Sequence, residues 1–168
     1  MKKFTLLIAS LFITMGAMAQ NVVTAINIEK VYTLKCKATD HSQYIGITDA
    51  GEINGRSSTA VRIKFEAAEG GGYYIKVGDK YLNNSANGSA LKTEETGKTV
   101  WTLNVPSHTT GVVTFGCGSD YYLNNNYTSG APYLKSNYHN GGPGSGNACS
   151  LWEMREYEPT PVLTASDF

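Results

Sequence analysis

The sequence has no strong excess of either charge, and this absence excludes whole classes of partner. It contains 14 Lys and Arg residues against 14 Asp and Glu residues. It also lacks a basic run that could neutralise a row of phosphates, on which DNA- and RNA-binding domains depend. We therefore expect no nucleic-acid partner.

Cysteine is scarce. Cys36, Cys117 and Cys149 allow at most one internal disulfide, with one thiol left over. Two interpretations remain open at this stage. The cysteines are small buried hydrophobic residues, or Cys117 and Cys149 form a bridge, which an oxidising compartment would permit. Their spacing does not match a zinc site, and we expect neither a metal nor another cofactor.

Long apolar runs are absent outside the N-terminus. There, residues 4–15 are almost wholly apolar, follow two lysines and precede the small-residue pattern Ala17-Met18-Ala19. This is the arrangement of a signal peptide that is cleaved ahead of Gln20, and the run is too short to span a membrane comfortably. The sequence predicts a signal peptide over 1–19 and a secreted, periplasmic or cell-surface protein without membrane insertion.

Stretches of strong helix formers are also missing, whereas 18 Gly and 11 Tyr residues favour strands and turns. The roughly 150 residues after the signal peptide suit one domain, which we place at 20–158. Pro159-Thr160-Pro161 then begins a stiff tail over 159–168. Such a connector is typical of a module that is fused to, or associated with, a larger enzyme in relatives.

An internal repeat is the clearest positive feature. A Tyr-aliphatic pair recurs at a matching place in three segments, and an apolar aromatic follows each of these pairs after roughly twenty to thirty residues. The pairs are Tyr44-Ile45, Tyr81-Leu82 and Tyr122-Leu123, and the aromatics are Phe65, Trp101 and Trp152. We define repeat one as 31–70, repeat two as 72–107 and repeat three as 111–158. A repeat of this period determines the fold, because one unit cannot bury its apolar face alone.

Each repeat begins with a strand-like segment and ends with an alternating one. Residues 63–65, Ile-Lys-Phe, show the period of two that places one row of side chains in a core. Three units of about four strands predict an all-β fold, a β-trefoil, with a β-sandwich as the alternative. By the same periodicity, we expect both tryptophans and the three tyrosines of the pairs in the core. The stretch Asp49–Asn54 lacks the spacing of a calcium loop and is expected to connect a hairpin.

The recurring Tyr-Leu-polar step, together with the aromatic that precedes an aliphatic by two positions, resembles the ricin-type β-trefoil (ricin B-like lectin) domain over residues 31–158. In that family, an Asp after a Cys-Leu step binds sugar hydroxyls in a shallow surface pocket. An aromatic residue on the following loop stacks on the sugar ring, and a Gln-x-Trp motif closes the repeat. The resemblance implies a non-catalytic, secreted carbohydrate-binding module whose partner is a glycan or polysaccharide.

The motif positions of this family differ between the three repeats. The Asp position holds Gly46, Asn83 or Asn124, and the Gln-x-Trp position holds Ile63-Lys64-Phe65, Thr99-Val100-Trp101 or Ser150-Leu151-Trp152. Repeat one therefore offers no side chain for a sugar, whereas an Asn amide both donates and accepts as a sugar diol requires. The predicted carbohydrate-binding residues are Asn83, Asn124, Tyr133 and Tyr138, with the best site expected in repeat three.

Other interpretations of these residues remain. Asn is favoured in turns, where it tolerates left-handed backbone. His41, His108 and His139 lie in turn-like contexts without a nucleophile or an orienting acid beside them, so we expect no enzyme. The alternative functions are a β-trefoil protease inhibitor, or a structural or protein-interaction module without a sugar ligand. The Gly-rich segment 140–147 is expected to be a mobile surface loop and is a poor inhibitory loop.

Overall fold

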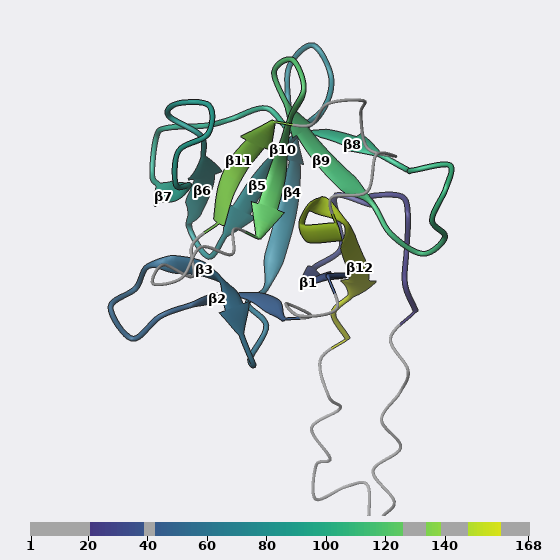
Figure 1. The fold of residues 1–168 in the computed structure, drawn as a ribbon. Coiled ribbons are helices and arrows are strands. Elements are labelled where there is room, and N and C mark those ends of the chain that lie inside the picture. The colour runs from purple at the N-terminus through teal and green to yellow at the C-terminus, as the bar shows by residue number, and fades with distance from the viewer. Residues whose placement is uncertain (1–20, 39–42, 126–133, 139–147, 159–168) are drawn as a thin grey trace, which may run out of the picture.

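A computed structural model describes residues 21–38, 43–125, 134–138 and 148–158 (Figure 1). The prediction of an all-β fold is confirmed. The described residues form twelve strands and a short 3-10 helix, η2 (Ala148–Ser150), and within these ranges no helix is long and apolar enough to cross a membrane. The strands are β1 (Tyr32–Cys36), β2 (Tyr44–Ile47), β3 (Ile53–Ser57), β4 (Ile63–Ala67), β5 (Tyr73–Val77), β6 (Lys80–Asn83), β7 (Lys92–Glu94), β8 (Thr102–Asn104), β9 (Thr114–Cys117), β10 (Tyr121–Asn125), β11 (Leu134–Tyr138) and β12 (Trp152–Glu156).

Six of the strands pair in a closed circuit. Strand β1 pairs with β4, β4 with β5, β8 with β9, and β12 returns to β1, all antiparallel. The two remaining steps are the isolated bridges Tyr73↔Trp101, from β5 to the start of β8, and Val113↔Trp152, from the start of β9 to β12. Each repeat therefore contributes its first and its last strand to the circuit.

The other six strands form three hairpins, β2–β3, β6–β7 and β10–β11, one from each repeat (Figure 1). Hydrogen bonds join the hairpins to one another. Leu91 N–H donates to the Leu134 carbonyl at 2.8 Å, and the Asn125 amide donates to the Gly55 carbonyl at 2.8 Å. The hairpins of different repeats thus pack against one another. This packing is expected, because a single repeat cannot bury its own apolar face.

The two tryptophans lie at the centre of the core, as the alternation predicts. Both are completely buried, and each ring N–H donates to the backbone carbonyl of the aliphatic residue in its own repeat. The Trp101 Nε1 to Leu82 oxygen distance is 3.4 Å, and the Trp152 Nε1 to Leu123 oxygen distance is 3.0 Å. Phe65 of repeat one has no such donor and instead stacks on Phe115 with ring centroids 5.5 Å apart.

The prediction that the tyrosines of the three pairs line the core is wrong for two of them. Ile45, Leu82 and Leu123 are fully buried, whereas Tyr44 and Tyr81 are only half-buried, and Tyr122 is buried. Neighbouring residues of a strand face opposite sides, so the aliphatic residue of each pair occupies the core, and Tyr44 and Tyr81 face outward. The Lys35 ammonium lies 5.5 Å from the centroid of the Tyr44 ring.

Of the two interpretations of the cysteines, the structure supports small buried residues over a Cys117–Cys149 bridge, since all three cysteines are free thiols. Cys36 and Cys117 are buried, as small hydrophobic residues would be, and Cys149 is half-buried. Burial raises the pKa of all three thiols, that of Cys117 to about 11. These thiols are protonated at neutral pH and are poor nucleophiles.

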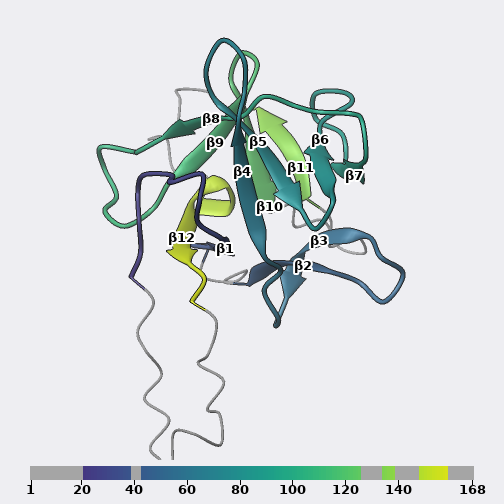
Figure 2. The ribbon, with the colours of Figure 1, turned by 180° about the vertical axis from the view of Figure 1, so that it is seen from behind.

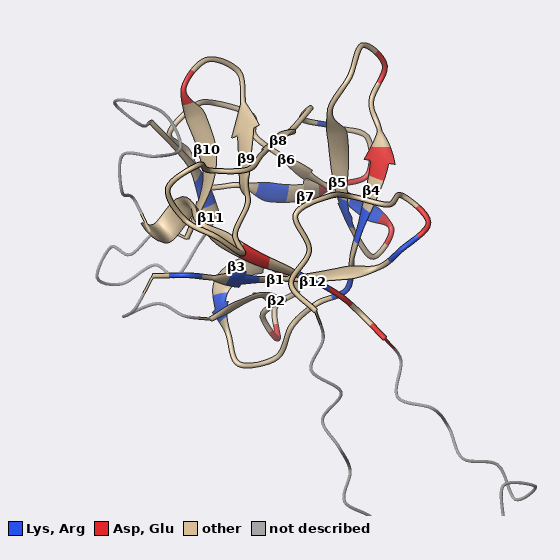
Figure 3. Cartoon of the chain, turned by 90° about the vertical axis from the view of Figure 1, so that its right-hand side faces the viewer, with Lys and Arg blue, Asp and Glu red and all other residues tan. Residues whose placement is uncertain are grey.

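The two ends of the described domain meet at β12. Val22 pairs with Arg155, and Val23 N–H donates to the Met154 carbonyl at 2.8 Å (Figure 2). Acidic and basic residues are interspersed over the strands (Figure 3), as the balanced composition suggests. A ligand site must therefore be argued from local chemistry.

Candidate functional site

Asn83, a predicted sugar-binding residue of repeat two, lies half-buried at the end of β6. Its amide is held from both sides: Nδ2 donates to Glu94 Oε2 at 2.9 Å, and Oδ1 accepts from Thr99 Oγ1 at 2.9 Å. Gly97 lies directly against this pair, because a Cβ there would overlap Glu94 Oε2 and approach Asn83 Nδ2 to 2.7 Å. The amide is therefore oriented by its own repeat and only partly accessible.

Asn124, the corresponding residue of repeat three, is 2% exposed. Its Nδ2 donates to Ser150 Oγ at 2.9 Å. The prediction that Asn124 contacts a sugar on the outer surface does not agree with this position, because the amide faces the interior. Its role in the described structure is to connect β10 with the segment that leads into β12.

The two repeats use these positions in the same way. In each, the Asn after the Tyr-aliphatic pair bonds to the hydroxyl residue that precedes the tryptophan by two positions. These are the two places where the ricin-type motif carries Asp and Gln. The substituted residues thus contact each other and stabilise the junction between the hairpin strand and the closing strand.

Repeat one has no counterpart of this contact. A Cβ on Gly46 would overlap the Ser57 side chain and come within 3.1 Å of the Thr59 carbonyl oxygen. The register of β2 and β3 shifts between Tyr44 and Gly46, which brings the backbones close. The structure therefore explains why this position carries no side chain.

Tyr138 is the predicted site residue that the structure places openly on the surface. It lies at the end of β11 and is 51% exposed. Tyr121, half-buried, lies directly across the hairpin, and the two ring centroids are 5.7 Å apart in a tilted arrangement. Tyr133 lies outside the described residues, as does the predicted loop 140–147.

A second group of aromatic side chains on repeat two was missed by sequence reasoning. The rings of Tyr74 and Tyr81 meet edge to face at 6.1 Å, and the Lys98 ammonium lies 4.1 Å from the centroid of the Tyr81 ring. The Tyr81 hydroxyl donates to Glu66 Oε2 at 2.8 Å, and this bond is the main reason that the pKa of Glu66 is lowered. The polar groups of these residues therefore bond to one another. The Lys98 ammonium lies over the Tyr81 ring, where a stacking sugar would have to lie.

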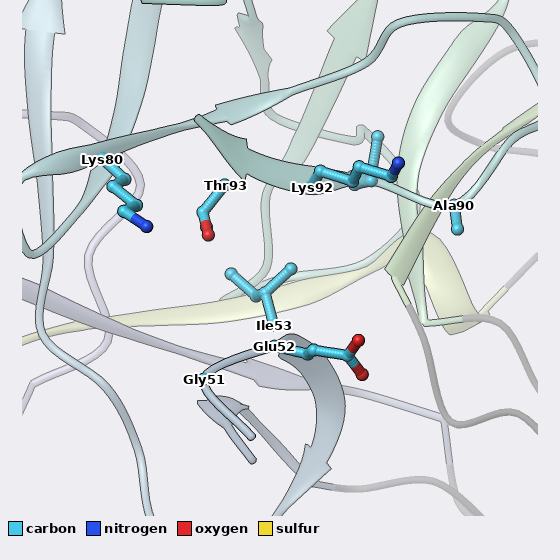
Figure 4. A pocket seen from close by; sticks show the side chains of 8 residues that line it. Gly51, Glu52, Ile53, Lys80, Ala90, Lys92 and Thr93 are labelled. Atoms are coloured by element: carbon cyan, nitrogen blue, oxygen red, sulfur yellow. The ribbon is translucent and has the colours of Figure 1, made fainter. Parts of the chain in front are cut away.

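A pocket of about 450 Å³ opens between repeats one and two (Figure 4). One wall is the turn between β2 and β3, Gly51 to Ile53, and the other consists of Lys80 at the start of β6 and residues 90–93 leading into β7. No local sequence pattern indicates this pocket, because its walls are far apart along the chain. The prediction that 49–54 connects a hairpin is confirmed, and this connection supplies the first wall.

The described residues offer little for catalysis. Across 21–38, 43–125, 134–138 and 148–158, no group of three His, Cys, Asp or Glu residues could hold a metal ion. His108 is exposed in a turn, as predicted, and His41 and His139 lie outside these ranges. The arrangement found in the described residues is one of surface aromatic rings, oriented amides and a pocket with charged residues at its rim.

The comparisons with known proteins support the fold. No family model matches the chain, and no curated protein is similar to it in sequence. Among solved structures, it is similar to the Macrolepiota procera ricin B-like lectin (MPL) in complex with lactose, with a TM-score of 0.59 and 12% identity over 79% of this chain and 99% of that one. At this low identity the match concerns the fold alone, and the chain therefore has the ricin B-like fold.

Proposed function

We propose that this protein is an exported, non-catalytic carbohydrate-binding module with a β-trefoil fold. The observation that carries the proposal is the structural similarity to a lectin that was solved with lactose. The closed circuit of six strands and the three hairpins, one per repeat, support the trefoil architecture over a sandwich. Fold alone does not establish a ligand, so the proposal needs a site.

The site we propose lies in repeat three, at the tyrosine pair of the β10–β11 hairpin. The exposed ring of Tyr138, with Tyr121 beside it, offers the kind of aromatic face on which the C–H side of a pyranose stacks. We also assign Tyr133 to this surface, on the basis of its sequence position alone. Asn83 remains a secondary candidate for sugar contact in repeat two. Asn124 supports the site indirectly, because its hydrogen bond to Ser150 holds β10 in place.

A glycan array probed with residues 20–168 tests the function, and titration of the best ligand tests the site. We expect Tyr138→Ala to weaken binding by about tenfold, the loss expected for one stacked aromatic ring. Tyr138→Phe is the matched control, since it keeps the ring and should bind almost normally. Thermal unfolding of each variant confirms that the fold is retained.

Two results would contradict this proposal. The absence of any ligand on a broad array would remove the lectin function. Binding that Tyr138→Ala and Tyr133→Ala both leave intact would remove the repeat-three site. Inhibition of a member of a protease panel by the wild-type protein would instead support the alternative of a trefoil inhibitor.

Export is a separate part of the proposal. It depends on the two lysines, the apolar run and the Ala17-Met18-Ala19 pattern. N-terminal sequencing of the protein recovered from its native cells should begin at Gln20. A mature protein that retains residues 1–19 would contradict the predicted cleavage.

A further inference from the structure

The pocket between repeats one and two has a chemistry that differs from the tyrosine surface. Its floor is apolar, because Ile53 and Leu91 are almost fully buried. Its rim is charged and exposed, with Lys80 and Lys92 on the β6–β7 side and Glu52 on the opposite side (Figure 4). Its volume of about 450 Å³ is in the range of small-molecule sites.

The two lysines of the pocket are free to meet a ligand. No ion pair or side-chain hydrogen bond to Lys80 or Lys92 is found in the described part of the chain, although lysines elsewhere in the protein pair with Glu66, Glu153 and Glu156. Figure 4 shows the Lys80 side chain and the Thr93 hydroxyl extending from β6 and β7 toward Ile53 on the facing turn. The pocket therefore combines two cationic groups, one anionic group and a hydroxyl over an apolar floor.

The fold keeps this pocket open. Strand β7 is the last strand in the order β3-β2-β1-β4-β5-β6-β7. Leu91, just before β7, bonds to Leu134. None of the described strands pairs with the outer edge of β7 itself. The β2–β3 turn faces this edge and is itself fixed, because the Thr48 hydroxyl accepts from Glu52 N–H at 3.1 Å. The walls are thus set by backbone contacts and do not depend on the charged side chains.

From this arrangement we infer that the pocket binds an anionic sugar residue, one that carries a carboxylate or a sulfate ester. The anionic group meets the ammonium group of Lys80, since lysine binds such groups as a point charge. Lys92 lines the same pocket further along β7 and adds positive charge to its rim. The ring lies on Ile53 and Leu91, and its hydroxyls meet Thr93 and Glu52. The inference depends on the proposed function for the ligand being a sugar, but it concerns a different surface from Tyr138.

Calorimetric titration with three oligosaccharides tests the inference: trigalacturonate, neutral galactotriose, and galactotriose bearing sulfate esters. We expect the anionic probes to bind more tightly than the neutral one, and to lose affinity as NaCl rises from about 0.05 to about 0.5 M, because salt screens exposed charges. A preference for trigalacturonate over the sulfated probe identifies a carboxylate site, and the reverse preference identifies a sulfate site.

Substitutions with opposite expected signs sharpen the test. Lys80→Gln should weaken binding of the anionic probe by about three- to tenfold, because it removes the charged contact. Lys92→Gln should weaken it by about two- to threefold, because it removes a more distant positive charge from the rim. Glu52→Gln should strengthen it by about two- to fivefold, because it removes a like charge from the rim. The matched control is Lys64→Gln, an exposed lysine on β4 that does not line the pocket, and it should change nothing.

The outcomes separate this inference from the proposed function. Equal affinity for neutral and anionic probes, or the same effect from Lys64→Gln as from the pocket variants, overturns the inference and leaves glycan binding at Tyr138 intact. Loss of neutral-glycan binding in Tyr138→Ala with unchanged binding of trigalacturonate supports two separate sites. Failure of every anionic probe to bind overturns the inference outright.

Discussion

Repeats two and three differ from repeat one in how they hold their closing strands. In repeats two and three, an Asn–hydroxyl bond and a tryptophan ring N–H both connect the hairpin strand with the closing strand. Repeat one has neither, because Gly46 and Ile63 occupy the two polar positions and Phe65 replaces the tryptophan. Repeat one thus lacks both members of the polar pair, whereas repeats two and three have both.

In repeats two and three, the motif positions contribute to the structure more than to a ligand surface. The Asp and Gln positions of the ricin-type motif are still paired by hydrogen bonds in repeats two and three, but the residues there face each other more than they face solvent. What remains on the surface is aromatic in repeat three and charged between repeats one and two. The following predictions test the contrast between the repeats, from the largest expected effect to the smallest.

Replacing Trp152 should produce the largest loss of stability. Trp152→Ala should lower the free energy of unfolding by about 4 kcal/mol, because it empties a fully buried site. Trp152→Phe should cost about 2 kcal/mol, because the Leu123 carbonyl loses its donor in the core. Chemical denaturation measures both. An unchanged free energy of unfolding in Trp152→Phe would show that repeat three tolerates a phenylalanine as well as repeat one does.

Installing the missing amide in repeat one should also be costly. Gly46→Asn should destabilise the protein by about 3 kcal/mol, since the new side chain must displace Ser57 in a buried strand. The control is Gly70→Asn, at a φ of +84° with open space around it, which should cost less than about 1 kcal/mol because Asn tolerates this conformation. Equal losses for the two variants would contradict the steric explanation.

Removing the amides should affect repeat three more than repeat two. Asn124→Ala should cost about 2 kcal/mol, because it leaves the buried Ser150 hydroxyl without this donor, and Asn83→Ala about 1 kcal/mol, because Asn83 is partly solvated. A double-mutant cycle of Asn124→Ala with Ser150→Ala should give a coupling energy of about 1 kcal/mol. A coupling near zero would show that the two residues do not act as a unit.

The smallest predicted effect concerns acid stability at the junction of repeats three and one. The Lys37 ammonium donates to Glu153 Oε1 at 2.9 Å and holds the pKa of Glu153 below its usual value of 4.5. Because the folded pKa is lowered, this contribution to stability is present above about pH 4.5 and is lost as the pH falls through the folded pKa. Glu153→Gln should therefore show a shallower fall of Tm between about pH 5 and pH 3 than the wild type.

Glu66, at the junction of repeats one and two, is the internal comparison for this effect. Its pKa is also lowered, chiefly by the hydrogen bond from Tyr81, but its side chain is 41% exposed against 18% for Glu153. Solvent screening reduces the contribution of the more exposed carboxylate. Glu66→Gln should flatten the same pH dependence less than Glu153→Gln, and the reverse order would contradict the argument from burial.

The sequence was sufficient for the features that depend on local periodicity. Alternation located Trp101, Trp152 and Phe65 in the core. The same periodicity was misapplied to Tyr44 and Tyr81, because a pattern of alternate residues does not say which of two neighbours faces inward. That choice depends on which strand lies across from them.

The candidate site was less predictable for the same reason. The burial of Asn124 depends on Ser150, and the pocket depends on a turn near Glu52 meeting Lys80 and Lys92. No local pattern contains these contacts, since they join segments from different parts of the chain. Tyr138 was expected on the loop of repeat three, and the structure places it instead at the exposed end of β11.

The pairing of β1 with β12 has a consequence for how the protein is made. Tyr32 lies opposite Glu156, so the circuit of strands cannot close until the last strand, β12, has been synthesised and pairs with β1. Contacts between residues so distant in sequence form slowly, since the ends of a long loop must first be brought together. A chain that crosses a membrane from its N-terminus would therefore keep β1 without its β12 partner until β12 emerged. Any helper that shields apolar strands during export would be most needed in that interval.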